Sequence, residues 1–77
     1  MPVLVRLQFC VITMYPNDHN PPHFHVVGGD GRDALVRLGS LAVLNGEVDR
    51  RAMKEAVEWA RLNEGFLQES WNDFQNG

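Results

Sequence analysis

The sequence lacks most of the devices that reinforce small proteins or direct them out of the cell. Cys10 is its only cysteine, so no disulfide can form within the chain. No apolar run approaches the roughly 20 residues of a membrane span, and residues 1–6 have neither the basic lead nor the apolar core of a signal peptide. We therefore expect a cytoplasmic protein that engages no membrane. A bound metal ion or oligomerisation could still stabilise its small hydrophobic core.

Basic residues are also in short supply. Seven lysines and arginines stand against ten acidic residues, which gives a net charge of -3. This balance argues against a protein whose whole surface binds nucleic acid. A chain of 77 residues is near the lower limit at which one hydrophobic core is stable. We expect a single domain over residues 1–77.

Strand-forming residues dominate the first half of the chain. Residues 3–14 are rich in β-branched and apolar side chains and predict one strand, or two strand pieces joined at a bend. Residues 15–22 hold three prolines, two asparagines and one aspartate, which predicts a stiff loop. Three later segments have strand composition, with a glycine-rich reversal between the first two: residues 23–27, 33–38 and 41–45.

The last third of the chain has helical periodicity. Asp49 is placed to accept hydrogen bonds from the free amides of a first helical turn. Two apolar stripes follow at helical spacing, one on each side of Gly65: Met53, Ala56, Val57 and Ala60, and then Leu67, Trp71 and Phe74. Gly65 predicts a kink or a break near residues 63–65. The expected fold is α+β, with a small three- or four-stranded, mostly antiparallel sheet covered on one face by one kinked or two C-terminal helices.

All three histidines of the chain fall within seven residues, at His19, His23 and His25. On a strand, His23 and His25 share a face, with Cα atoms about 6.5–7 Å apart, while Phe24 faces the other side. Two imidazoles at this spacing can converge on one divalent metal ion such as zinc, and His19 or Asp18 in the loop can supply a third ligand. Three protein ligands and one open position are typical of a catalytic zinc site.

Two other interpretations of the same residues stay open. Imidazoles titrate near neutral pH, so His23 and His25, with His19, could act as acid–base or phosphate-binding groups without a metal. The histidines can equally be structural, capping turns or bonding to carbonyl groups, and Asp18 is a typical turn former ahead of two prolines. The sequence alone does not decide whether the protein is an enzyme.

Three stretches of the chain resemble a known family. Residues 14–25 hold Met-Tyr-Pro-Asn-Asp-His-Asn-Pro-Pro-His-Phe-His, and residues 41–46 hold Leu-Ala-Val-Leu-Asn-Gly. Residues 51–60 begin with an arginine and end with Val-Glu-Trp-Ala. Together these stretches resemble the signature of an uncharacterised bacterial family, domain of unknown function 4160 (DUF4160). The resemblance covers nearly the whole chain.

The family has no established activity to carry over. Its small proteins resemble components of toxin–antitoxin modules, typically encoded beside a second small protein, which implies a protein partner or a homo-oligomer and a role for RNA if nucleic acid is involved. Small size and two tryptophans, Trp59 and Trp71, also favour a protein-interaction module. The alternative is a histidine-dependent hydrolase or ribonuclease that uses residues 18–25, with or without a divalent metal.

Overall fold

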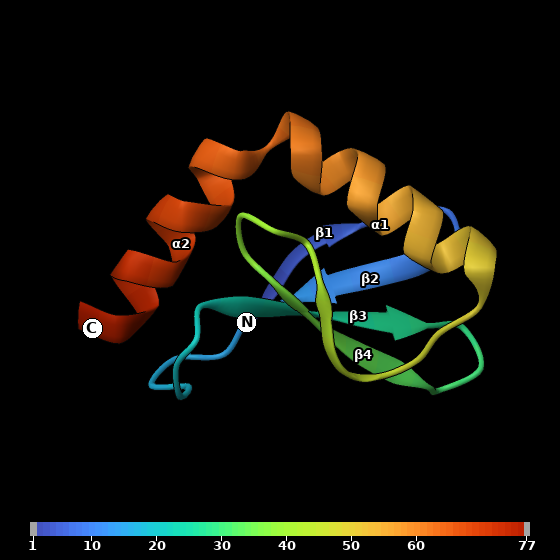
Figure 1. Cartoon of the computed structure of the whole chain (residues 1–77), viewed down its shortest axis with the longest axis horizontal. Coiled ribbons are helices and arrows are strands. Elements are labelled where there is room, and N and C mark those ends of the chain that lie inside the picture. Colours follow the sequence, from blue (N-terminus) through green and yellow to red (C-terminus); the bar gives the residue numbers. More distant parts are fainter. Residues whose placement is uncertain (1, 77) are drawn as a thin grey trace.

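A computed structural model describes residues 2–76 and has the predicted α+β class. The elements are β1 (Val3–Arg6), β2 (Cys10–Thr13), β3 (His23–Gly28), β4 (Asp33–Arg37), β5 (Val43–Gly46), α1 (Arg50–Leu62) and α2 (Glu64–Asn76). The strands lie side by side in the order of the chain and form one antiparallel sheet (Figure 1). Both helices follow the sheet in the sequence.

The sheet has five strands, so the predicted number of three or four is wrong. Residues 3–14 form two antiparallel strands, β1 and β2, because the chain reverses between them. At this corner the Leu7 amide donates to the Cys10 carbonyl at 2.8 Å. The amides of Gln8 and Phe9 donate to the carboxylate of Glu55 on α1, at 3.0 and 2.7 Å. A distant helix residue thus stabilises the corner that divides the segment into two strands.

The predicted hairpin over residues 23–38 is confirmed as β3 and β4. In its register His23 is opposite Arg37 and His25 is opposite Leu35. The next strand, β5, begins two residues later than residues 41–45 predicted and pairs only with β4, at the edge of the sheet.

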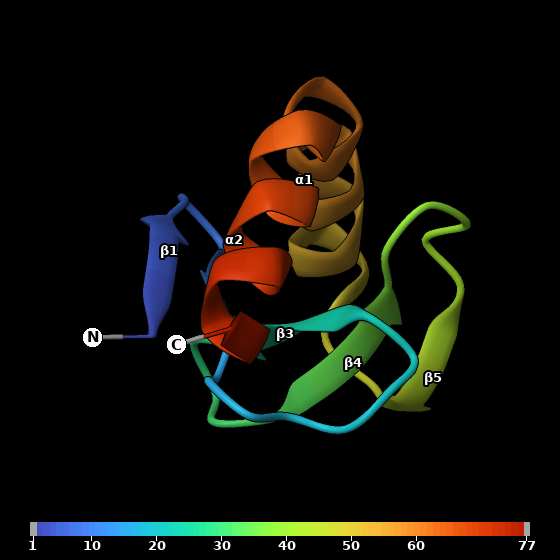
Figure 2. The ribbon, with the colours of Figure 1, turned by 90° about the vertical axis from the view of Figure 1, so that its left-hand side faces the viewer.

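The two helices cover one face of the sheet (Figure 2). The Asp49 carboxylate accepts from the Arg51 amide at 3.3 Å, which confirms the predicted N-cap. Helix α1 ends at Leu62 and α2 begins at Glu64, so the break falls in the predicted region. Helix α2 bends away from α1 and passes the end of the sheet at which β3 begins (Figure 1).

The hydrophobic core lies between the helices and the sheet. Its fully or nearly fully buried members are Cys10, Ile12, Met14, Phe24, Val26, Val36, Ala52, Ala56, Ala60, Leu67 and Trp71. Because side chains alternate along a strand, the residues between these core positions point to the opposite face of the sheet, which α1 does not cover (Figure 2). No helix within residues 2–76 has the length and apolar character needed to cross a membrane.

Candidate metal centre

Strand alternation brings His23 and His25 to the same face of β3, as the sequence predicted. Phe24 between them is fully buried in the core. The ring centroids of the two histidines are 5.3 Å apart. Residues 15–22, the blue to cyan loop that leads into β3, lie below the start of β3 on the side away from α1 (Figure 1), and the Asn17 amide donates to the Phe74 carbonyl of α2 at 3.4 Å. The two imidazoles and this loop therefore meet on the side of the sheet opposite α1.

His23 is the buried member of the pair, with only 1% of its side chain exposed. Its ring packs against Trp71 of α2, with centroids 5.4 Å apart. Its Nδ1 lies 2.7 Å from the carbonyl oxygen of Pro21. A carbonyl oxygen can only accept, so we assign the proton to Nδ1, which donates it. In a neutral His23 the free lone pair is then on Nε2, at the other side of the ring.

Asp18 in the loop presents a carboxylate to this lone pair. Its Oδ2 lies 3.0 Å from Nε2 of His23 and 3.4 Å from Nε2 of His25. One ligand atom from each of the three residues can be chosen so that all lie within 4.8 Å of one another. Two lone-pair atoms facing each other at hydrogen-bond distance require a cation between them. Either a proton or a metal ion can fill this role.

His25 lies between two carboxylates. While its Nε2 faces Asp18, its Nδ1 is 3.8 Å from Oδ2 of Asp33 on β4. The ring of Tyr15 meets the imidazole edge-on, with centroids 4.8 Å apart. The side chains of His25 and Asp18 are 16% and 17% exposed. Solvent therefore reaches the cluster from this side, whereas the His23 side is closed.

His19 lies at the rim of the cluster. Its side chain is 80% exposed, and its Nδ1 is 3.1 Å from the other carboxylate oxygen of Asp18, Oδ1. Its ring centroid is 5.6 Å from that of His23. Of the four residues that the sequence singled out, the structure thus brings together Asp18, His23 and His25.

The surroundings of Asp18 favour its ionised form. Burial alone would raise the pKa of this carboxyl group. The hydrogen bond from the backbone amide of His19, at 2.9 Å, and that from His25, together with the charge and hydrogen bond that His23 supplies in its protonated form, outweigh burial and lower the pKa below its usual value. Asp18 is therefore ionised throughout the neutral pH range and can serve as an anionic metal ligand.

Sequence reasoning missed two side chains that flank the imidazole pair. Thr13 is opposite His25 in the register of β2 and β3. It is 6% exposed, and its hydroxyl oxygen has no hydrogen-bond partner among residues 2–76. Arg37 is opposite His23 in the register of β3 and β4. Directly opposite residues share a face of the sheet, so the predicted hairpin could have identified Arg37, whereas nothing in the sequence sets the register of Thr13.

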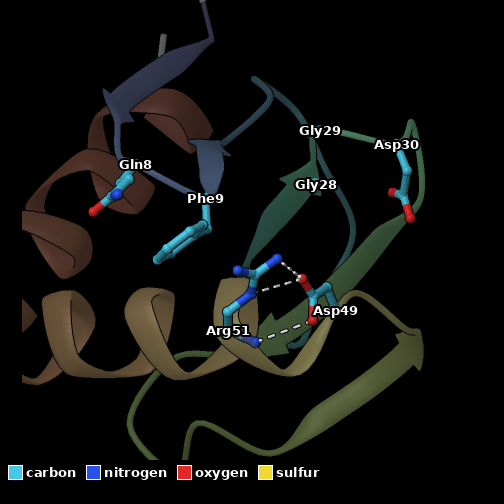
Figure 3. Close-up of a pocket in the computed structure, with 7 residues that line it drawn as sticks. All are labelled: Gln8, Phe9, Gly28, Gly29, Asp30, Asp49 and Arg51. Atoms are coloured by element: carbon cyan, nitrogen blue, oxygen red, sulfur yellow. Dashed lines mark hydrogen bonds and ion pairs between the residues drawn. The ribbon is translucent and has the colours of Figure 1, made fainter.

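A depression in the surface lies at the other end of β3 (Figure 3). It is lined by Gln8, Phe9, Gly28, Gly29, Asp30, Asp49 and Arg51. The Nε of Arg51 lies 3.4 Å from the Asp49 carboxylate, and its guanidinium is 4.9 Å from the centre of the Phe9 ring. These charged groups are engaged with their neighbours, and no histidine lines the depression. The chemistry-bearing residues are therefore those at the N-terminal end of β3.

Comparison with known proteins bears on the family but not on the chemistry. A family model described as Domain of unknown function (DUF4160) matches residues 10–72, a span that includes Asp18 and all three histidines. Searches of curated proteins and of solved structures found no match. Any function must therefore be argued from the geometry of the site.

Proposed function

Because the chain belongs to the DUF4160 family, which is described only as a domain of unknown function, we propose from geometry that it binds a divalent transition-metal ion through Asp18, His23 and His25. The main support is the approach of Nε2 of His23 to Oδ2 of Asp18, at 3.0 Å. A metal ion with bonds of about 2.1 Å to both atoms would span this gap at an angle of about 90°, and the 3.4 Å gap to His25 at about 110°. Both angles are ordinary for tetrahedral or octahedral coordination.

The outer contacts of the two imidazoles also support a metal. Histidine ligands usually donate their second ring N–H to a backbone carbonyl or a carboxylate, which sets the ring orientation. Nδ1 of His23 donates to the Pro21 carbonyl at 2.7 Å. Nδ1 of His25 lies 3.8 Å from the Asp33 carboxylate. The His23 ring therefore has a bonded acceptor behind it and its Nε2 in front, whereas the carboxylate behind His25 lies beyond hydrogen-bond distance.

Protons and a metal ion would fill the cluster differently. A proton shared by His23 and Asp18 makes His23 an imidazolium ion, whereas His25 can stay neutral and donate from Nε2 to the same carboxylate oxygen. This arrangement buries a charged ring, of which only 1% is exposed. A single divalent cation would instead accept a lone pair from each of the three residues.

Two imidazoles and one carboxylate suit zinc, and also iron(II). We propose zinc, because three protein ligands with a free position are typical of hydrolytic zinc sites. The partial exposure of His25 and Asp18 supports a free position that faces solvent. A hydrolase, including a ribonuclease, is the enzyme class that such a centre would serve.

Elemental analysis of protein purified without a histidine tag tests the proposal. We expect about one metal ion per chain in the natural protein, and loss of that metal in His23→Ala and in His25→Ala. His19→Ala is the matched control and should retain the metal, because His19 lies at the rim. A natural chain that carries no metal and takes up neither zinc nor iron(II) on addition would refute the proposal. Equal metal loss in all three variants would refute the ligand assignment.

A second candidate function is protein association in the cytoplasm, as a homo-oligomer or with a second small protein encoded nearby, as in a toxin–antitoxin pair. The supporting observation is β5, an edge strand on which Val43 and Leu44 are 51% and 42% exposed. Unpaired edges with apolar side chains are where another chain can add to a sheet. The test is the mass in solution, alone and with the neighbouring gene product. A strict monomer that ignores this product would contradict the proposal.

A further inference from the structure

We propose that the metal centre takes a phosphate-type oxyanion, held between the metal ion and the guanidinium of Arg37. This inference rests on the proposed metal site and adds the class of ligand that the site would bind. Thus the ion would occupy the centre formed by Asp18, His23 and His25, and Arg37 would contact the anion from the neighbouring strand.

The register of the hairpin puts Arg37 next to His23. It is the last residue of β4 and lies directly opposite His23. Opposite residues of an antiparallel pair have Cβ atoms about 4.5–5.5 Å apart on the same face, and an arginine side chain is long enough to reach beyond such a neighbour. Arg37 is also exposed at the surface, so its guanidinium is open to a ligand.

The charge of Arg37 is not compensated within the part of the chain that the structure describes. No carboxylate among residues 2–76 lies within ion-pair distance of its guanidinium. By contrast, Arg32 and Arg51 are each paired with a neighbouring aspartate, at 2.8 and 3.4 Å. Arg37 is thus a free cation on the same sheet face as the two imidazoles.

A metal ion reverses the sign of the charge that an anion would meet here. Without the metal, the carboxylates of Asp18 and Asp33 are on either side of His25 and disfavour an anion. With a divalent cation in place, the metal becomes the largest local charge. A planar guanidinium pairs with two phosphate oxygens, while a third oxygen can take the free position on the metal. Anion binding should therefore need both the metal and Arg37.

The test uses the full chain loaded with Co²⁺, whose visible spectrum reports directly on its ligands. Uptake of Co²⁺ is measured first, and it decides the metal site independently of any anion. Inorganic phosphate and dimethyl phosphate, a diester, are then titrated separately into three proteins: the natural chain, Arg37→Gln and Arg6→Gln. Arg6 is the matched control, because it lies opposite Val11 on β1, on the same sheet face but three strands from Arg37.

We expect at least one of the two anions to change the Co²⁺ spectrum of the natural chain. We expect Arg37→Gln to weaken that binding about tenfold or more, as for loss of a charge-assisted hydrogen bond, and Arg6→Gln to leave it within about twofold. Binding of the diester favours a phosphodiester ligand, and binding of phosphate alone favours a free phosphate or a monoester. Co²⁺ uptake without any anion effect, or equal binding by Arg37→Gln and Arg6→Gln, overturns the inference and leaves the metal site standing. Absence of Co²⁺ uptake overturns both.

Discussion

Replacing Asp18 with asparagine removes the charge of the one anionic ligand among the three proposed and changes the side chain by one atom. The carboxylate oxygen that both imidazoles face is the atom affected. Without metal, the amide of an asparagine can donate to Nε2 of His23, whose other nitrogen already donates to the Pro21 carbonyl. We therefore expect the variant to fold, with a thermal midpoint in EDTA close to that of the natural chain.

The size of the metal effect follows from linkage. Zinc at 100 times its dissociation constant stabilises a folded protein by about 2.7 kcal/mol, which for a chain of this size raises Tm by about 10–20 °C. This is an upper value, because all three ligands lie within residues 18–25 and the unfolded chain keeps some affinity. If loss of the carboxylate weakens zinc binding about 100-fold, the same zinc concentration stabilises Asp18→Asn by only about 0.4 kcal/mol, or about 2–3 °C.

Thermal unfolding followed by circular dichroism, in zinc and in EDTA, measures both values. Asp30→Asn is the matched control, because this aspartate is exposed in the turn after Gly28, at the other end of β3 from His23. It should show the same zinc shift as the natural chain. The metal assignment would be refuted by equal midpoints of the natural chain in zinc and EDTA. A full zinc shift in Asp18→Asn would refute the role of the carboxylate.

Three further predictions concern the surroundings of the site and the fold. Thr13→Val removes a buried hydroxyl that has no hydrogen-bond partner and keeps the shape of the side chain. It should therefore raise the free energy of unfolding of the metal-free protein, measured in denaturant melts, by about 1 kcal/mol. A loss of stability would contradict this prediction. Gly46→Ala should lower the free energy of unfolding by about 3 kcal/mol or more, because φ is 75° and a Cβ would collide with the Asp33 carbonyl. Gly39→Ala, with φ 84° and open space around the new Cβ, should lower it by about 1 kcal/mol. Equal losses in the two variants would exclude the collision as a cause. Burial, and then a neighbouring helix carboxylate, raises the pKa of Cys10 to about 11. Above about pH 9 the unfolded chain releases the thiol proton, whereas the folded protein keeps it. The free energy of unfolding should therefore fall by up to about 2.7 kcal/mol as pH rises from 9 to 11. A fall of the same size in Cys10→Ala would contradict this origin.

Local signals in the sequence predicted the features that depend on nearby residues. The N-cap at Asp49, the helix break before Gly65 and the hairpin that contains His23 and His25 all follow from neighbours in the chain. The alternation that places both imidazoles on one face and Phe24 in the core is also local, because it follows from the period of a strand.

Features that depend on distant contacts could not be predicted in the same way. The corner that separates β1 from β2 is bonded to Glu55 of α1, and no pattern in residues 3–14 records that contact, so the composition of these residues left one strand or two open. The choice between Asp18 and His19 depends on how the loop folds against the sheet. Residue type favoured the imidazole, but the loop carries the carboxylate inward and leaves His19 at the rim. Trp71 becomes the wall of the site only because α2 bends past the end of β3.

The order of elements along the chain has a consequence for synthesis. All five strands precede both helices, so every strand is synthesised, and begins to leave the ribosome, before α1 and α2 do. During that interval Phe24, Val26 and Val36 have no helix to cover them, and His23 has no indole against it. The nascent sheet is therefore the form of this protein most open to aggregation and to capture by chaperones. Its protection comes from the last third of the chain.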